Sequence, residues 1–148
     1  MKVVVWIVEG TWRPCVRAVR DLAPVDAELV LLHVTGRDAP GAAHGAFAGL
    51  LGRGHPELDP GHEVERLGGA AAEELLRMAA AELRRPSTLL NLFGRAEHEV
   101  VAAAEAADLL VLSRDGNRPG PKSFGPATRF VVDHAPCPVL LLRPDISR

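Results

Sequence analysis

The sequence predicts an α/β fold in which a five-stranded parallel sheet carries helices on both faces. Apolar runs of strand length alternate along the chain with segments of helical periodicity. The connections between successive runs are long enough for the helical crossovers that parallel strands require. The 148 residues, 47% of them hydrophobic, suffice for one packed core, so we expect a single domain over residues 1–148.

The first part of the chain predicts two strands and one helix. Residues 3–8, VVVWIV, form a continuous β-branched run, as expected of a strand that is buried on both faces. Thr11 is expected to cap the next helix, which has Pro14 in its first turn and ends at Pro24. Residues 27–35, AELVLLHVT, predict the second strand.

A long irregular stretch and one clear helix follow. Residues 36–69 are rich in Gly, Pro and His, and within them residues 42–51 predict a short helix. Residues 70–85 predict a longer helix with a leucine stripe and early glutamates. Arg84 and Arg85 fall in its last turn, where positive charge suits the helix dipole.

In the rest of the chain, predicted strands and helices alternate strictly. A weaker third strand is predicted at 87–93, a helix at 97–107, the fourth strand at 108–112, a helix at 127–134 and the fifth strand at Val139–Leu142. The fifth strand, VLLL, would lie at a sheet edge, and exposed apolar edges invite pairing. We therefore expect a homodimer in which this strand pairs antiparallel with its copy across a two-fold axis.

Composition excludes several classes of function. The formal net charge is −2 and aromatic residues make up 4% of the chain, so neither a basic patch nor a base-stacking platform for nucleic acid is expected. No apolar run reaches membrane-spanning length, and the start of the chain lacks the pattern of a signal peptide, so we expect a cytoplasmic protein without membrane contact. Cys15 and Cys137 form no CxxC pair and are interpreted as buried free thiols.

The candidate ligand site lies where the strands end. In parallel α/β sheets, ligands bind beyond the carboxyl ends of the strands. Glu9, Gly10 and Thr11 follow the first strand, Val34 lies at the end of the second, and residues 113–128, SRDGNRPGPKSFGPAT, follow the fourth. A glycine-rich loop that leads into a helix is a common place for phosphate binding.

Four segments carry a resemblance to a known family. They are VVVWIVEGTWRPCVRAV near the start, LVLLHV, AEHEVVAAAEAADLLVLSR, and HAPCPVLLLR near the end. Through them the chain resembles the universal stress proteins over nearly its whole length. The resemblance implies an adenine-nucleotide alpha-hydrolase-like sheet with strand order 3-2-1-4-5, and it implies the same homodimer.

The resemblance also supplies a nucleotide pattern to compare. Family members that bind ATP carry Gly-x2-Gly-x9-Gly-Ser/Thr after strand four. Ser113 stands at the first glycine, while Gly116 and Gly125 keep the second and third. The stretch between these two glycines is one residue short, and Pro126 stands at the Ser/Thr position.

Other positions of the pattern are partly kept. Glu9 stands where ATP-binding members carry an Asp, and Val34 matches a position that meets adenine through its backbone. Arg114, Arg118 and Lys122 place positive charge beside the entrance of the helix and would attract polyanions.

The departures weaken the expected phosphate binding. Pro126 offers neither a hydroxyl nor an N–H, and Pro119 and Pro121 remove two further N–H groups. Losing two charge-assisted donors costs roughly 3–6 kcal/mol, or about 10²–10⁴-fold in affinity. We therefore expect ATP to bind weakly or not at all.

Three functions remain open. The first is a non-catalytic stress-response protein that senses a nucleotide or anion weakly. The second is an ATP-binding protein with weak hydrolysis, although no nucleophile elbow, catalytic carboxylate pair or GxxxxGK[ST] motif is present. The third is a protein-interaction module in which residues 36–69 select the partner.

The histidines predict no metal site. His44, His55 and His62 share the irregular stretch without the spacing of metal ligands, and we interpret them as solvated loop residues. His33 lies within a buried strand pattern and is expected to be hydrogen-bonded in the core. His134 is expected to order the HAPCP turn.

Overall fold

The computed structural model describes residues 1–36, 60–116, 120 and 123–144, and of residues 60–67 the backbone alone. Its sheet has five parallel strands in the order β3-β2-β1-β4-β5, which confirms the predicted class and strand order. The strands are β1 (Lys2–Trp6), β2 (Glu28–Thr35), β3 (Thr88–Phe93), β4 (Leu109–Ser113) and β5 (Val139–Leu142).

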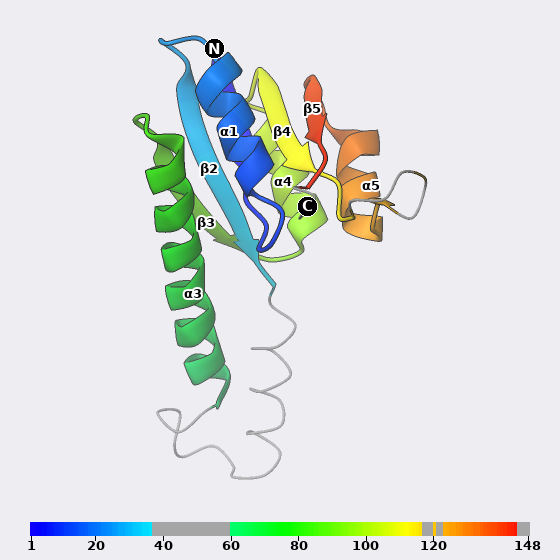
Figure 1. Ribbon diagram of the computed structural model, residues 1–148. Coiled ribbons are helices and arrows are strands. Elements are labelled where there is room, and N and C mark those ends of the chain that lie inside the picture. The colour runs from blue at the N-terminus through cyan, green and yellow to red at the C-terminus, as the bar shows by residue number, and fades with distance from the viewer. Residues whose placement is uncertain (37–59, 117–119, 121–122, 145–148) are drawn as a thin grey trace.

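Helices cover both faces of the sheet, as predicted (Figure 1). One face carries α1 (Arg13–Leu22) and α3 (Pro60–Leu83), and the other carries α4 (Ala96–Ala104) and α5 (Pro126–His134). Side chains of β1 alternate between these layers. Val3 and Val5 pack with α1 and α3, whereas Val4 and Trp6 pack with α4 and α5. Burial on both faces explains why the central strands read as continuous apolar runs.

The bounds of α3 differ from the prediction. The helix begins at Pro60, inside the stretch that was interpreted as irregular, and it ends at Leu83 rather than at residue 85. The predicted start of this helix is too late because the helix contains Gly68 and Gly69, and glycine lowers helix propensity. In the structure these glycines bring α3 close to the sheet: a Cβ on Gly68 would lie 3.4 Å from Cγ2 of Thr35.

Arg84 and Arg85 lie beyond the end of α3. Arg84 has a φ of 56°, which takes the chain out of the helix. The expectation that these arginines complement the dipole of their own helix is therefore wrong. The predicted helix at 42–51 lies outside the described residues.

Other element bounds shift only slightly. The largest of these shifts is at the end of α4, which stops at Ala104 where the sequence predicted residue 107. No helix in the described part of the chain is long and apolar enough to cross a membrane.

Candidate functional site

The loops that carry the predicted site residues follow neighbouring strands and lie at one edge of the sheet. β1 and β4 are hydrogen-bonded neighbours in parallel register, with Val5 opposite Val111. The loop after β1 and the loop after β4 therefore start side by side, at the carboxyl edge where β2 also ends (Figure 1). This is the edge of the sheet at which the sequence predicts that a ligand binds.

The turn after β1 contributes Glu9, Gly10 and Thr11. Glu9 and Gly10 are exposed, and the N–H of Thr11 donates to the carbonyl of Val8 over 3.2 Å. Gly10 has a φ of 85°, a backbone conformation that favours glycine. The prediction that Thr11 caps α1 is wrong, because Trp12 is the N-cap residue and provides no side-chain cap. Trp12 is instead buried in the core beneath this turn.

Two neighbouring residues shape the end of β2. Nδ1 of His33 donates a hydrogen bond to the carbonyl of Ile7 over 2.8 Å, which confirms that His33 is hydrogen-bonded and ties the end of β2 to the end of β1. Val34 is 8% exposed, and its side chain packs toward α4 and α5. The carbonyl of Leu32 faces β1, since it accepts from the N–H of Ile7. Because backbone groups alternate in direction along a strand, the N–H and C=O of Val34 also point toward the β1 side. They lie beyond Trp6 and Leu32, the last residue pair of the β1–β2 ladder.

Arg114 is held within the loop that follows β4. Its guanidinium donates to Oγ of Ser123 over 2.5 Å and lies 4.4 Å from the ring centroid of Phe124. Its backbone N–H donates to the carbonyl of Leu142 on β5. The Ser113 hydroxyl donates to the carbonyl of Arg114 over 2.9 Å. The guanidinium of Arg114 therefore braces the loop, and its role in attracting polyanions stays a prediction.

Ser123 accepts backbone hydrogen bonds from two other residues of the same loop. Its carbonyl accepts the N–H groups of Asp115 and Gly116, at 2.8 and 3.3 Å. Its hydroxyl donates to the carbonyl of Gly120 over 2.8 Å, and the residue is 2% exposed. Two N–H groups that lie where a phosphate would be expected are thus used internally. Sequence reasoning missed Ser123, and only its place within the loop distinguishes it in the sequence.

The carboxylate of Asp115 lies against the start of α5. One of its carboxylate oxygens accepts the N–H of Gly125, and the other accepts the hydroxyl of Thr128 over 3.1 Å. Gly125 is the N-cap residue of α5, and Thr128 is 2% exposed. The sequence showed Asp115 only as an acid among the basic residues of the loop. Its contact with the helix was not predicted.

The glycines of the loop play different parts than the pattern suggested. Gly125 has an extended backbone with a φ of −76°, so its conformation does not demand glycine. Gly120, which the pattern does not include, has a φ of 108°. Lys122, Arg118, Pro119 and Pro121 lie outside the described residues.

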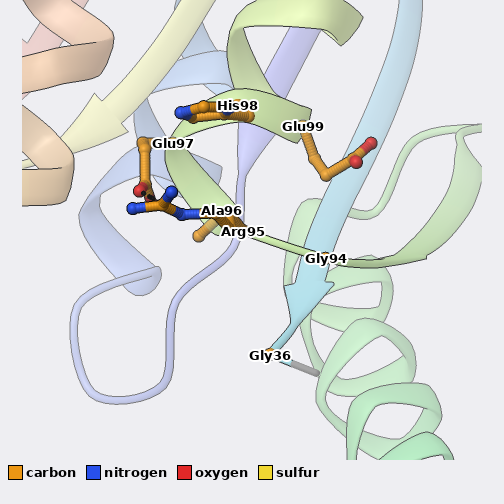
Figure 2. A pocket seen from close by; sticks show the side chains of 7 residues that line it. All are labelled: Gly36, Gly94, Arg95, Ala96, Glu97, His98 and Glu99. Atoms are coloured by element: carbon orange, nitrogen blue, oxygen red, sulfur yellow. Dashed lines mark ion pairs between the residues drawn. The ribbon is translucent and has the colours of Figure 1, made fainter. Parts of the chain in front are cut away.

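A separate hollow of about 510 Å³ opens at the same edge of the sheet, around the N-terminus of α4 (Figure 2). Nε of Arg95 lies 3.3 Å from Oε1 of Glu97, while Glu99 leaves the helix on the side that faces β2. The described lining residues include none of those predicted from the sequence; they are Gly36, Gly94, Arg95, Ala96, Glu97, His98 and Glu99.

Stacked rings join this hollow to α5. The rings of His98 and Phe130 lie 5.2 Å apart between centroids, and those of Phe130 and His134 lie 4.0 Å apart. Nδ1 of His134 also lies 2.8 Å from the carbonyl of Phe130. His134 thus closes the last turn of α5. Among the described residues no group of histidines, cysteines and carboxylates is placed to hold a metal ion, and His44 and His55 lie outside them.

Comparison with known proteins decides the family. The family model described as "Universal stress protein family" matches residues 8–143. The chain belongs to the universal stress protein family. No curated protein sequence matches it.

Solved structures share the fold of this universal stress protein. The structure of the hypothetical protein MJ0577 has a TM-score of 0.73 at 17% identity, with 99% of this chain and 97% of that chain covered. A universal stress protein in complex with cAMP has a TM-score of 0.64 at 18% identity, with 98% of each chain covered. A universal stress protein from Archaeoglobus fulgidus has a TM-score of 0.59 at 17% identity, covering 95% and 92%.

Proposed function

We propose that this universal stress protein is non-catalytic and senses an adenine nucleotide weakly in the crevice at the ends of β1, β2 and β4. The observation that carries the proposal is the internal bonding of the loop after β4. The N–H groups of Asp115 and Gly116 donate to Ser123, and the Arg114 guanidinium is bound by Ser123 and Phe124. A ligand phosphate must break bonds that the loop already makes, so the net gain per phosphate contact is small.

The other end of the crevice supports binding of a base and a sugar. The backbone N–H and C=O of Val34 point past the end of the β1–β2 ladder, where an adenine edge could meet a donor and an acceptor. Glu9 is exposed in the turn that follows β1, at the same edge of the sheet, and its carboxylate suits a ribose hydroxyl. The complex of a structural neighbour with cAMP agrees with this class of ligand.

We also propose that the protein is a homodimer that pairs through β5 and acts in the cytoplasm. β5 is an edge strand of the sheet, and its four residues are half-buried. An unpaired edge of this kind is readily covered by a copy of itself. Imaging of a tagged chain in cells tests the compartment.

Thermal unfolding with ATP, combined with calorimetry, tests the nucleotide proposal. For a Kd of about 1 mM, 1 mM ATP stabilises the fold by about 0.4 kcal/mol and raises Tm by only about 1–3 °C. We expect a shift of that size and no release of phosphate above that of a protein-free control. A Kd near 1 µM contradicts weak sensing, and sustained phosphate release contradicts a non-catalytic role.

A further inference from the structure

The carboxylate of Asp115 has the position that a bound anion would take at α5. It accepts the Gly125 N–H with one oxygen and the Thr128 hydroxyl with the other, over 3.1 Å in the latter case. The donors are the backbone N–H of the N-cap residue Gly125 and the hydroxyl of Thr128 in the first turn, at the end of the helix where the dipole favours negative charge. The contact joins residues that are ten positions apart in the chain, so it is a tertiary contact rather than a local cap.

The surroundings hold the carboxylate in that place. A Cβ on Gly125 would lie 3.0 Å from Oδ2 of Asp115, so any larger residue there would press against the carboxylate. The neighbouring Arg114 is directed to Ser123 and Phe124. Within the described part of the chain, the side-chain hydrogen bonds of Asp115 therefore go to the N-cap residue and the first turn of α5, and Thr128 is buried.

We propose that Asp115 is an internal ligand that closes the phosphate end of the crevice, so that the protein selects adenine nucleosides and monophosphates over triphosphates. This inference rests on the proposed function for the base and sugar end of the crevice. Each added phosphate brings negative charge toward a carboxylate that already accepts the Gly125 N–H and the Thr128 hydroxyl, and like charges at close range repel. A triphosphate gains only by displacing Asp115.

Calorimetry on charge-matched variants tests the inference. Asp115→Asn removes the charge and keeps an oxygen that can still accept from Thr128, while Asp115→Ala removes the side chain. Asp133→Asn is the control, because Asp133 is an exposed acid of the same helix. The ligands are adenosine, AMP, ATP and inorganic tripolyphosphate at constant ionic strength, and circular dichroism verifies the fold of each variant.

The expected result separates the effect of the Asp115 charge on phosphate binding from recognition of the base. The wild type and Asp133→Asn bind ATP no more tightly than adenosine. Asp115→Asn gains about 10- to 100-fold in affinity for ATP and for tripolyphosphate, the value of about one charge-assisted bond, with adenosine unchanged.

Two outcomes overturn the inference. One is a wild-type affinity that rises tenfold or more from adenosine to ATP, and the other is an Asp115→Asn variant that binds tripolyphosphate no better than Asp133→Asn does. Failure of the proposed function looks different: no protein binds adenosine, yet Asp115→Asn binds tripolyphosphate. That result retains Asp115 as an internal ligand while removing the base and sugar site.

Discussion

The guanidinium of Arg85 donates a hydrogen bond to the carbonyl of Ala23 over 3.0 Å. The same group donates to the carbonyls of Val19 and Arg20, at 3.2 and 3.3 Å, and to that of Pro24. The last carbonyls of a helix have no partner within the helix, and positive charge is favourable beside them. Arg85 therefore caps the C-terminus of α1 from the chain that follows α3.

Removing this cap is predicted to destabilise the fold. Arg85→Ala leaves half-buried carbonyls without their charged donor and is expected to lower the free energy of unfolding by about 1–3 kcal/mol in urea titrations. Arg85→Lys restores only part of the loss, because an ammonium lacks the planar fork of donors. The control is Arg84→Asn, which removes an equal charge at an exposed residue whose φ of 56° asparagine tolerates. Equal urea midpoints for Arg85→Ala and this control would contradict the role of Arg85.

Gly94 is predicted to be intolerant of a side chain. Its φ is 151°, and a Cβ would lie 2.9 Å from Oε1 of Glu99. Gly94→Ala is expected to lower the free energy of unfolding by about 1–3 kcal/mol through backbone strain. Gly36→Ala is the matched control, since a Cβ there meets nothing within 4 Å. Adding Glu99→Ala to Gly94→Ala separates the clash from the strain, and equal melting temperatures for the two single variants would argue against both.

The two thiols are predicted to differ in reactivity. Burial raises the pKa of Cys15 to about 12, and burial also raises that of the half-buried Cys137. Because the thiolate is the reactive form, a thiol reagent at pH 8 is expected to label Cys137 slowly and Cys15 only after unfolding. Labelling of native Cys137→Ser at the rate of the wild type would show that Cys15 is accessible.

The raised pKa of Cys15 also sets a dependence on pH. In the unfolded chain the thiol ionises near pH 9, whereas in the fold it stays protonated until about pH 12. The stability contributed by the protonated thiol is complete below pH 9 and is lost as the pH rises from 9 toward 12. Cys15→Ala is expected to flatten the fall of stability in that window relative to the wild type, measured by urea unfolding at successive pH values. An unchanged slope would contradict the assignment.

The sequence predicted the sheet well because its signal is local. Strands buried on both faces must be apolar throughout, and the VVVWIV run shows this directly. The roles of Arg85 and Asp115 were not predictable in the same way. Arg85 acts on a helix more than sixty positions earlier, and Asp115 reaches the start of α5 across its own loop. Charge pattern alone assigns such residues to their nearest helix or to a ligand, and only tertiary contacts correct the assignment.

The backbone geometry of β5 allows a selective test of the predicted homodimer. The carbonyls of Pro138 and Leu142 accept N–H groups of Leu110 and Arg114, so these two residues face β4. Strand alternation then turns the backbone of Leu140 toward β4 as well, and the backbones of Val139 and Leu141 toward the open edge. The N–H of Leu141 is thus available to a second chain and takes no part in the sheet of its own chain.

Leu141→Pro is therefore expected to abolish dimerisation while leaving the sheet of each chain intact. Proline removes the outward N–H of Leu141 and is tolerated at sheet edges. Leu141→Val is the control, since it keeps the N–H and places an apolar, β-branched side chain that suits a strand. Analytical ultracentrifugation at micromolar concentration should show a dimer for the wild type and the control, and a monomer with unchanged far-ultraviolet circular dichroism for Leu141→Pro. A wild-type monomer would refute the homodimer, whereas a dimeric Leu141→Pro would show that the interface does not depend on the outward N–H of Leu141.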